Sequence, residues 1–75
     1  MGTITKRETI AVISDLLTSC GIPRDLWKIM PGGELNILIG DIKLKFHCEA
    51  RLSHCQLKAL EDSVIKIIEV FSGRA

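Results

Sequence analysis

The chain is constrained most by a stretch near its middle in which hydrophobic residues recur at every second position on both sides of a Gly-Asp pair. These residues are Leu35, Ile37 and Ile39 before the pair, and Ile42, Leu44, Phe46 and Cys48 after it. A period of two is typical of strands with one buried face, and Gly40-Asp41 suits a two-residue hairpin turn. That turn pairs Ile39 with Ile42, which places all the alternating hydrophobic residues on one face. The sequence therefore predicts an antiparallel hairpin.

The opposite face of this hairpin is predicted to be mostly polar, because successive side chains of a strand point to opposite faces. The same register makes three pairs there: Leu38 with Lys43, Asn36 with Lys45, and Glu34 with His47. We expect this outer face to meet solvent or a partner.

A helix is predicted before the hairpin, at about residues 6–20. Thr5 and Glu8 have the spacing of a capping box, in which each satisfies a backbone amide of the other. Hydrophobic residues then follow at helical spacing: Ile10, Ile13, Leu16, Leu17 and Cys20. Gly21 is expected to end the helix, since glycine tolerates the left-handed conformation common at that position.

A second helix is predicted after the hairpin. Ser53 and Gln56 form another capping box, with Leu52 and Leu57 placed as a hydrophobic staple. The stripe that follows keeps the helical period to Gly73, where we expect the helix to end. Its members are Leu57, Leu60, Val64, Ile67, Ile68 and Phe71.

Residues 22–33 allow two interpretations. We favour a strand at residues 26–30 with Pro31-Gly32-Gly33 as a hairpin loop, which pairs Ile29 with Leu35, Trp27 with Ile37, and Lys28 with Asn36. The fold class is then α+β, in the order α-β-β-β-α: a three-stranded antiparallel meander with two helices packed on one face, in a single domain of residues 1–75. If Pro23 instead opens a short helix, the order becomes α-α-β-β-α with a two-stranded hairpin.

Composition limits the function classes. The net charge is +1, so a general polyanion binder, which needs a basic excess, is disfavoured. Three cysteines in no repeated spacing suggest free thiols in a reducing compartment, and we expect a cytoplasmic protein. The first residues lack the apolar run of a signal peptide, and no run is long enough to cross a bilayer. A membrane partner is therefore not expected.

The residues that could carry chemistry do not form a recognisable motif. His47-Cys48 and His54-Cys55 resemble metal ligands, but adjacent strand residues point apart and the paired short spacing of zinc sites is missing. Cys55 falls in the first turn of the second predicted helix, where backbone amides can lower a thiol pKa, yet His54 is poorly placed as its base. We expect no enzyme activity, cofactor or metal.

The predicted order α-β-β-β-α is similar to that of double-stranded-RNA-binding domains. The outer face would carry Lys28, Lys43, Lys45 and Arg51, diluted by Glu34 and Glu49. Those domains begin their second helix with a lysine cluster, whereas residues 53–58 here contain one lysine. Nucleic-acid binding by the basic outer face is therefore the alternative function.

Surplus hydrophobic residues favour protein binding instead. Leu26 and Leu38 are expected to be neighbours on the outer face, while Ile65 and Val70 flank the stripe of the second helix. We expect a small non-enzymatic protein–protein interaction module: a regulator, adaptor or inhibitor of bacterial or phage type that forms a homodimer and binds a further protein. Its predicted contact residues are Leu26, Lys28, Leu38, Lys43, Lys45, Ile65 and Val70.

Overall fold

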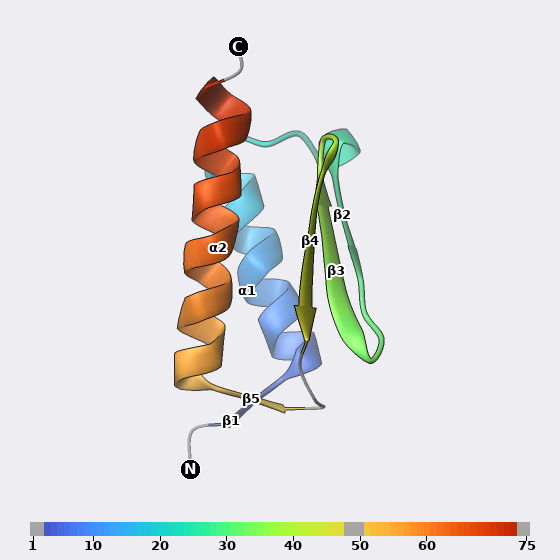
Figure 1. Cartoon of the computed structure of the whole chain (residues 1–75), viewed down its shortest axis with the longest axis vertical. Helices are drawn as coiled ribbons and strands as arrows, with labels where there is room; N and C mark the ends of the chain where they lie inside the picture. Colours follow the sequence, from blue (N-terminus) through green and yellow to red (C-terminus); the bar gives the residue numbers. More distant parts are fainter. Residues whose placement is uncertain (1–2, 48–50, 74–75) are drawn as a thin grey trace.

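The computed structural model describes residues 3–47 and 51–73, which form two helices on one side of a three-stranded antiparallel sheet (Figure 1). This arrangement confirms the α+β fold and the order expected for its main elements. The elements are β1 (Thr3–Thr5), α1 (Lys6–Ser19), the 3-10 turn η1 (Arg24–Leu26), β2 (Trp27–Met30), β3 (Glu34–Ile39), β4 (Ile42–His47), β5 (Arg51–Ser53) and α2 (His54–Gly73).

The hairpin of β3 and β4 has the register that its two-residue turn predicts. Ile39 lies opposite Ile42, and the pairing continues in step to Glu34 and His47. Gly40 has a φ of 62°, a left-handed conformation that glycine adopts without steric cost. Its N–H donates a 2.6 Å hydrogen bond to the carbonyl of Leu26, so the turn is tied to the start of β2.

The pairing of β2 with β3 differs from the prediction by two residues. Trp27 lies opposite Ile39 rather than Ile37, and Lys28 lies opposite Leu38 rather than Asn36. A shift of two keeps every side chain on its predicted face, so the hydrophobic pattern cannot distinguish the two registers. The hydrogen bond from Gly40 to Leu26 favours the observed one, because it brings the start of β2 level with the turn.

The termini of α1 follow from its flanking residues. The capping box of Thr5 and Glu8 is present. At the other end, the N–H groups of Gly21 and Ile22 donate to the carbonyls of Thr18 and Leu17, the two hydrogen bonds of a Schellman motif. This motif ends α1 at Ser19 and buries Ile22, which the sequence pattern did not identify as a core residue. Cys20, expected in the buried stripe, is exposed instead because the chain leaves the helix there.

A two-stranded sheet of β1 and β5, which was not predicted, joins the N-terminal ends of the two helices. Ile4 lies opposite the fully buried Leu52. Both strands lead directly into capping boxes, and the one at Ser53 and Gln56 is also present. Because the strands sit side by side, α1 and α2 begin at the same end of the molecule and run in the same direction (Figure 1).

The core lies between the helices and the inner face of the sheet. Its members are Ile13, Leu17, Ile22, Trp27, Leu35, Ile37, Ile39, Leu52, Leu60, Val64 and Ile68. The inward side chains of β3 are fully buried, whereas those of β4 are only half-buried. The reason is position: β3 is the central strand, and β4 lies at the edge. Cys48, predicted to pack in the core, lies outside the described residues.

Candidate protein-binding surface

The outer face of the three-stranded sheet gathers most of the predicted contact residues. The observed registers place Lys28, Leu38 and Lys43 in one row across β2, β3 and β4. The next row is Met30, Asn36 and Lys45. The side chains of all three lysines are exposed, while Leu38 is half-buried between two of them. We call these six residues the outer-face surface.

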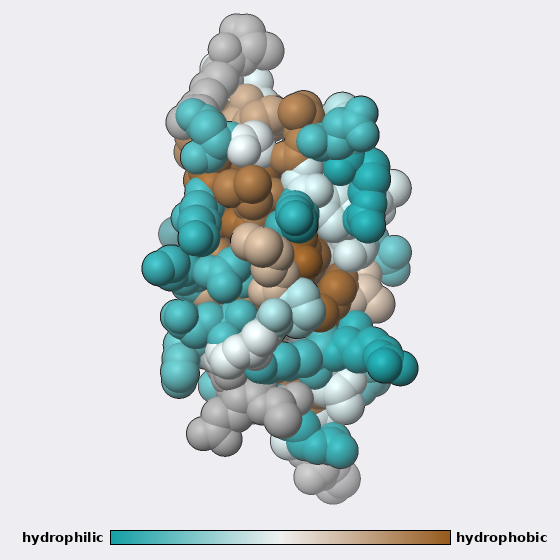
Figure 2. Space-filling view, turned by 90° about the vertical axis from the view of Figure 1, so that its right-hand side faces the viewer, coloured by the Kyte–Doolittle hydropathy of each residue, from teal (hydrophilic) through white to brown (hydrophobic). Residues whose placement is uncertain are grey.

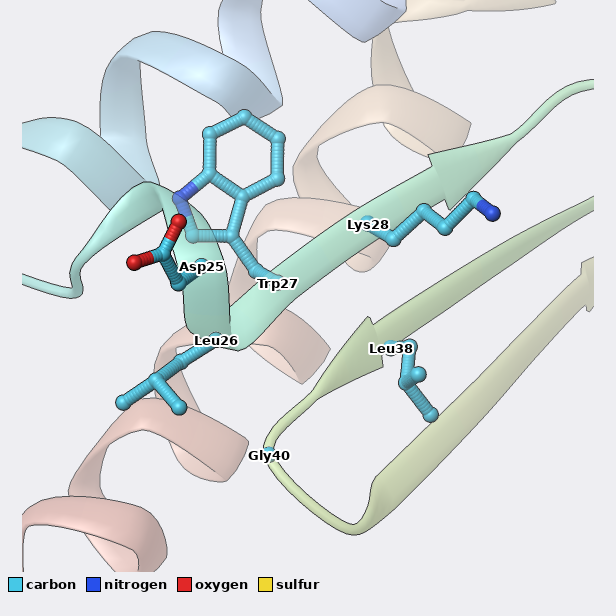
Figure 3. Close-up of a pocket in the computed structure, with 6 residues that line it drawn as sticks. All are labelled: Asp25, Leu26, Trp27, Lys28, Leu38 and Gly40. Carbon is cyan, nitrogen blue, oxygen red and sulfur yellow. The ribbon is translucent and has the colours of Figure 1, made fainter.

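A shallow hollow of about 280 Å³ opens at one end of the outer-face surface. It is lined by Asp25, Leu26, Trp27, Lys28, Leu38 and Gly40 (Figure 3). Leu26, at 41% exposure, is one of the exposed large hydrophobic residues of the described chain. The hollow exists because the Gly40 N–H holds the carbonyl of Leu26, which brings η1 beside the end of β3. Leu26 and Leu38 both line this hollow, but they are not paired across the sheet as the predicted register required, because Leu26 lies in η1 and Lys28 is the residue opposite Leu38.

Trp27 lines this hollow but is itself a core residue. Its ring extends away from Lys28 and Leu38, towards the helices (Figure 3), and its side chain is buried. The guanidinium carbon of Arg24 lies 4.1 Å from the ring centroid, a cation–π contact that covers the ring. Within residues 3–47 and 51–73, the indole Nε1 has no hydrogen-bond partner.

Two further hydrophobic side chains of the predicted set lie on α2. Ile65 is 40% exposed and Val70 is 55% exposed. At about 100° per residue, positions five apart on a helix point about 140° apart. Ile65 and Val70 therefore lie on opposite flanks of the buried stripe and cannot belong to one patch with each other.

Met30 is an exposed hydrophobic residue that the sequence analysis did not select. It is 40% exposed and shares the outer face with Lys28, because both occupy even positions of β2. The alternation that placed Lys28 on this face was sufficient to place Met30 there as well. Arg51, by contrast, was wrongly placed on this face: it belongs to β5, in the other sheet, and its guanidinium lies 3.4 Å from the hydroxyl of Thr3. Glu49 lies outside the described residues.

The residues considered for metal or thiol chemistry are dispersed. His47 is exposed at the end of β4, and His54 and Cys55 are exposed in the first turn of α2. Among the described residues, no group of three or more His, Cys, Asp and Glu side chains is placed to hold a metal ion. Cys20 and Cys55 are exposed free thiols at the C-terminal end of α1 and the N-terminal end of α2, respectively.

Searches with this chain give no match to a protein-family model, a curated protein or a solved structure. None of the helices in residues 3–47 and 51–73 is both long and hydrophobic enough to span a bilayer.

Proposed function

We propose that this chain is a non-enzymatic protein–protein interaction module that binds a partner through the outer-face surface and the hollow at its end. The observation that carries the proposal is the hollow itself, which is lined by two leucines, Leu26 and Leu38, beside Lys28. Hydrophobic anchors that fill pockets inside a polar rim supply most of the binding energy at protein interfaces.

The lining of the hollow suits binding better than catalysis. Besides Gly40 and the buried Trp27, its lining consists of two leucines, an aspartate and a lysine, with neither histidine nor cysteine among them. In this proposal, a hydrophobic side chain of the partner enters between Leu26 and Leu38. Acidic groups of the partner then meet Lys28 and Lys43, which give specificity and speed of association.

The test is affinity capture from an extract of the native host, comparing matched variants. Leu26→Ser and Leu38→Thr remove the hydrophobic lining, whereas Ile65→Ser removes a hydrophobic side chain on α2 that is as exposed as Leu26, at 40% against 41%. Each variant is first checked for a native thermal transition. We expect one protein to be recovered with the wild type and with Ile65→Ser, but to be lost with the two leucine variants. Equal recovery with all four proteins would refute the proposal.

We also propose that the module self-associates, and that α2 carries this contact. A symmetric contact through the outer-face surface would bring Lys28 and Lys43 against their own copies, which is unfavourable. Val70, more exposed than Ile65, is the stronger candidate on α2. Light scattering at increasing concentration should give twice the chain mass of 8.3 kDa, insensitive to salt, and Val70→Lys should restore the single chain mass. A single chain mass for the wild type at high micromolar concentration would contradict self-association.

Nucleic-acid binding is the second candidate, supported by the three exposed lysines on one face. Phosphate contacts of this kind weaken steeply with salt. A mobility shift at low salt that disappears in the double variant Lys43→Glu, Lys45→Glu would support this candidate. A protein complex that persists at high salt, with no shift of RNA or DNA, would support the first proposal instead.

A further inference from the structure

The outer edge of β4 is open to a further strand. Within the described residues, β4 pairs only with β3. Because Ile39 and Ile42 flank a two-residue turn, they exchange hydrogen bonds with each other, and alternate residues of β4 continue this pattern. The N–H and C=O groups of Lys43, Lys45 and His47 consequently point away from β3. They form a row of donors and acceptors that an extended chain can pair with.

The inner side of this edge is hydrophobic and incompletely covered. Ile42, Leu44 and Phe46 alternate along β4 and are all half-buried. On α2, which contacts β4, Ile67 and Phe71 are likewise half-buried. Figure 2, which faces the sheet side of the molecule, shows a band of hydrophobic residues open to the surface between hydrophilic margins. A strand added to β4 would cover part of this band with its inward side chains.

The outer side of the same edge is basic. Lys43 and Lys45 are both exposed and stand at alternate positions, so side chains directly opposite them on an added strand would lie close to both ammonium groups. A second copy of β4 is a poor occupant of this edge. If it paired antiparallel with β4 and kept its hydrophobic side inward, each of the two registers with the most paired residues would place a lysine directly opposite a lysine. Acidic side chains at the outward positions match this edge.

We propose that β4 binds an extended segment of a partner protein by strand addition, and that hydrophobic residues alternate with acidic residues in this segment. The hydrophobic side chains cover Leu44 and Phe46, and the acidic ones face Lys43 and Lys45. This inference rests on the proposed protein-binding function, and it specifies the chemistry and conformation of the bound segment.

The probe is a capped, fluorescein-labelled peptide of about eight residues in which glutamate alternates with valine. Its controls are a peptide of the same composition with the glutamates grouped at one end, and a peptide with lysine in place of glutamate. Fluorescence anisotropy should show binding of the alternating peptide at least about tenfold tighter than either control, since only that peptide satisfies both faces of the edge. Equal binding of the alternating and grouped peptides would overturn the proposal, because charge alone would then explain it.

Amide hydrogen exchange measured by NMR identifies the mode of binding. Strand addition should slow exchange of the Lys43, Lys45 and His47 amides by at least about tenfold, whereas the Leu44 and Phe46 amides, already bonded to β3, should change little. Protection confined to Leu26 and Leu38 would overturn strand addition and leave the proposed function intact. The absence of peptide binding at millimolar concentration would also overturn strand addition. The proposed function would still be tested separately, by capture of a partner with the Leu26 and Leu38 variants.

A matched pair of variants tests the backbone contribution. Lys45→Pro removes an N–H that points to the open edge, a position where an edge strand tolerates proline. Lys45→Thr removes the same charge and keeps the N–H. We expect Lys45→Pro to weaken peptide binding at least about tenfold relative to Lys45→Thr. Equal affinities of two folded variants would overturn the proposal; if Lys45→Pro does not fold, the alternating exchange pattern of the wild type decides.

Discussion

Replacing Gly40 with alanine should destabilise the protein far more than the same change at Gly21. Both glycines have positive φ, 62° at Gly40 and 79° at Gly21, so alanine meets the same conformational penalty of about 1–2 kcal/mol at each. Alanine also reduces the entropy of the unfolded chain, which returns about 0.4–1 kcal/mol. At Gly21 nothing lies within 4 Å of the added methyl group, so the net loss of unfolding free energy should be about 1 kcal/mol.

At Gly40 the added methyl group would meet the ring of Phe71. The Cβ position lies 2.5 Å from Cε1 and 3.1 Å from Cδ1 of that ring, well inside van der Waals contact. The ring sits at the edge of the core and must move to make room, and overpacking of this kind costs about 1–3 kcal/mol. Gly40→Ala should therefore lose about 2–4 kcal/mol, a large share of the stability of a domain this small.

Urea denaturation of Gly40→Ala, Gly21→Ala and the wild type measures this difference. A third substitution isolates the clash: Phe71→Leu should cost about 1 kcal/mol alone by leaving space, but should recover at least about 1 kcal/mol in the Gly40→Ala background. Gly21→Ala should be additive with Phe71→Leu. Equal destabilisation at the two glycines, or additivity of Gly40→Ala with Phe71→Leu, would refute the steric argument.

Three further predictions test the other elements. Hydrogen bonds from the N–H and hydroxyl of Thr5 lower the pKa of Glu8. The ionised Glu8 therefore stabilises the folded protein above the pKa that Glu8 has in the unfolded chain, and this stabilisation is lost as the pH falls through the folded pKa. Urea titrations across acidic pH should show that Glu8→Gln removes this pH-dependent loss of stability. Arg24→Ala should cost about 0.5–1 kcal/mol and shift the tryptophan fluorescence, because the guanidinium no longer covers the ring. Ile37→Ala should cost about 2–5 kcal/mol in thermal or urea unfolding, whereas Ile65→Ala, at an exposed site, should stay within about 0.5 kcal/mol.

The register of the described part of the hairpin, from Glu34 to His47, could be predicted because its turn length and its alternation specify the same pairing. Two residues between Ile39 and Ile42 leave one pairing that sends both hydrophobic sets inward. For β2 the sequence supplied only the alternation. A register shifted by two residues satisfies alternation equally well, and the hydrogen bond that favours the observed one joins Gly40 to Leu26, which are far apart in the sequence.

The remaining differences have similar physical origins. Strands β1 and β5 have three residues each, too few to show a period, and they are stabilised by pairing between segments that are far apart in the sequence. The faces of Lys28, Leu38 and Lys43 followed from alternation, so the composition of the outer-face surface was predictable. The hollow was not, because it depends on η1 lying against the end of β3.

The hollow and the core meet at Gly40. Some residues of the hollow can therefore be substituted without loss of stability, whereas others cannot. Gly40 lines the hollow on one side and abuts Phe71 on the other, so a change there alters both stability and the shape of the surface. Leu26 is held by its backbone: its carbonyl accepts a hydrogen bond from the Gly40 N–H, and its own N–H donates one to the carbonyl of Pro23. Its side chain is free to be exchanged without loss of the bond that forms the hollow. A substitution of the Leu26 side chain is consequently expected to change the surface of the hollow while the turn and the core beneath it remain unchanged.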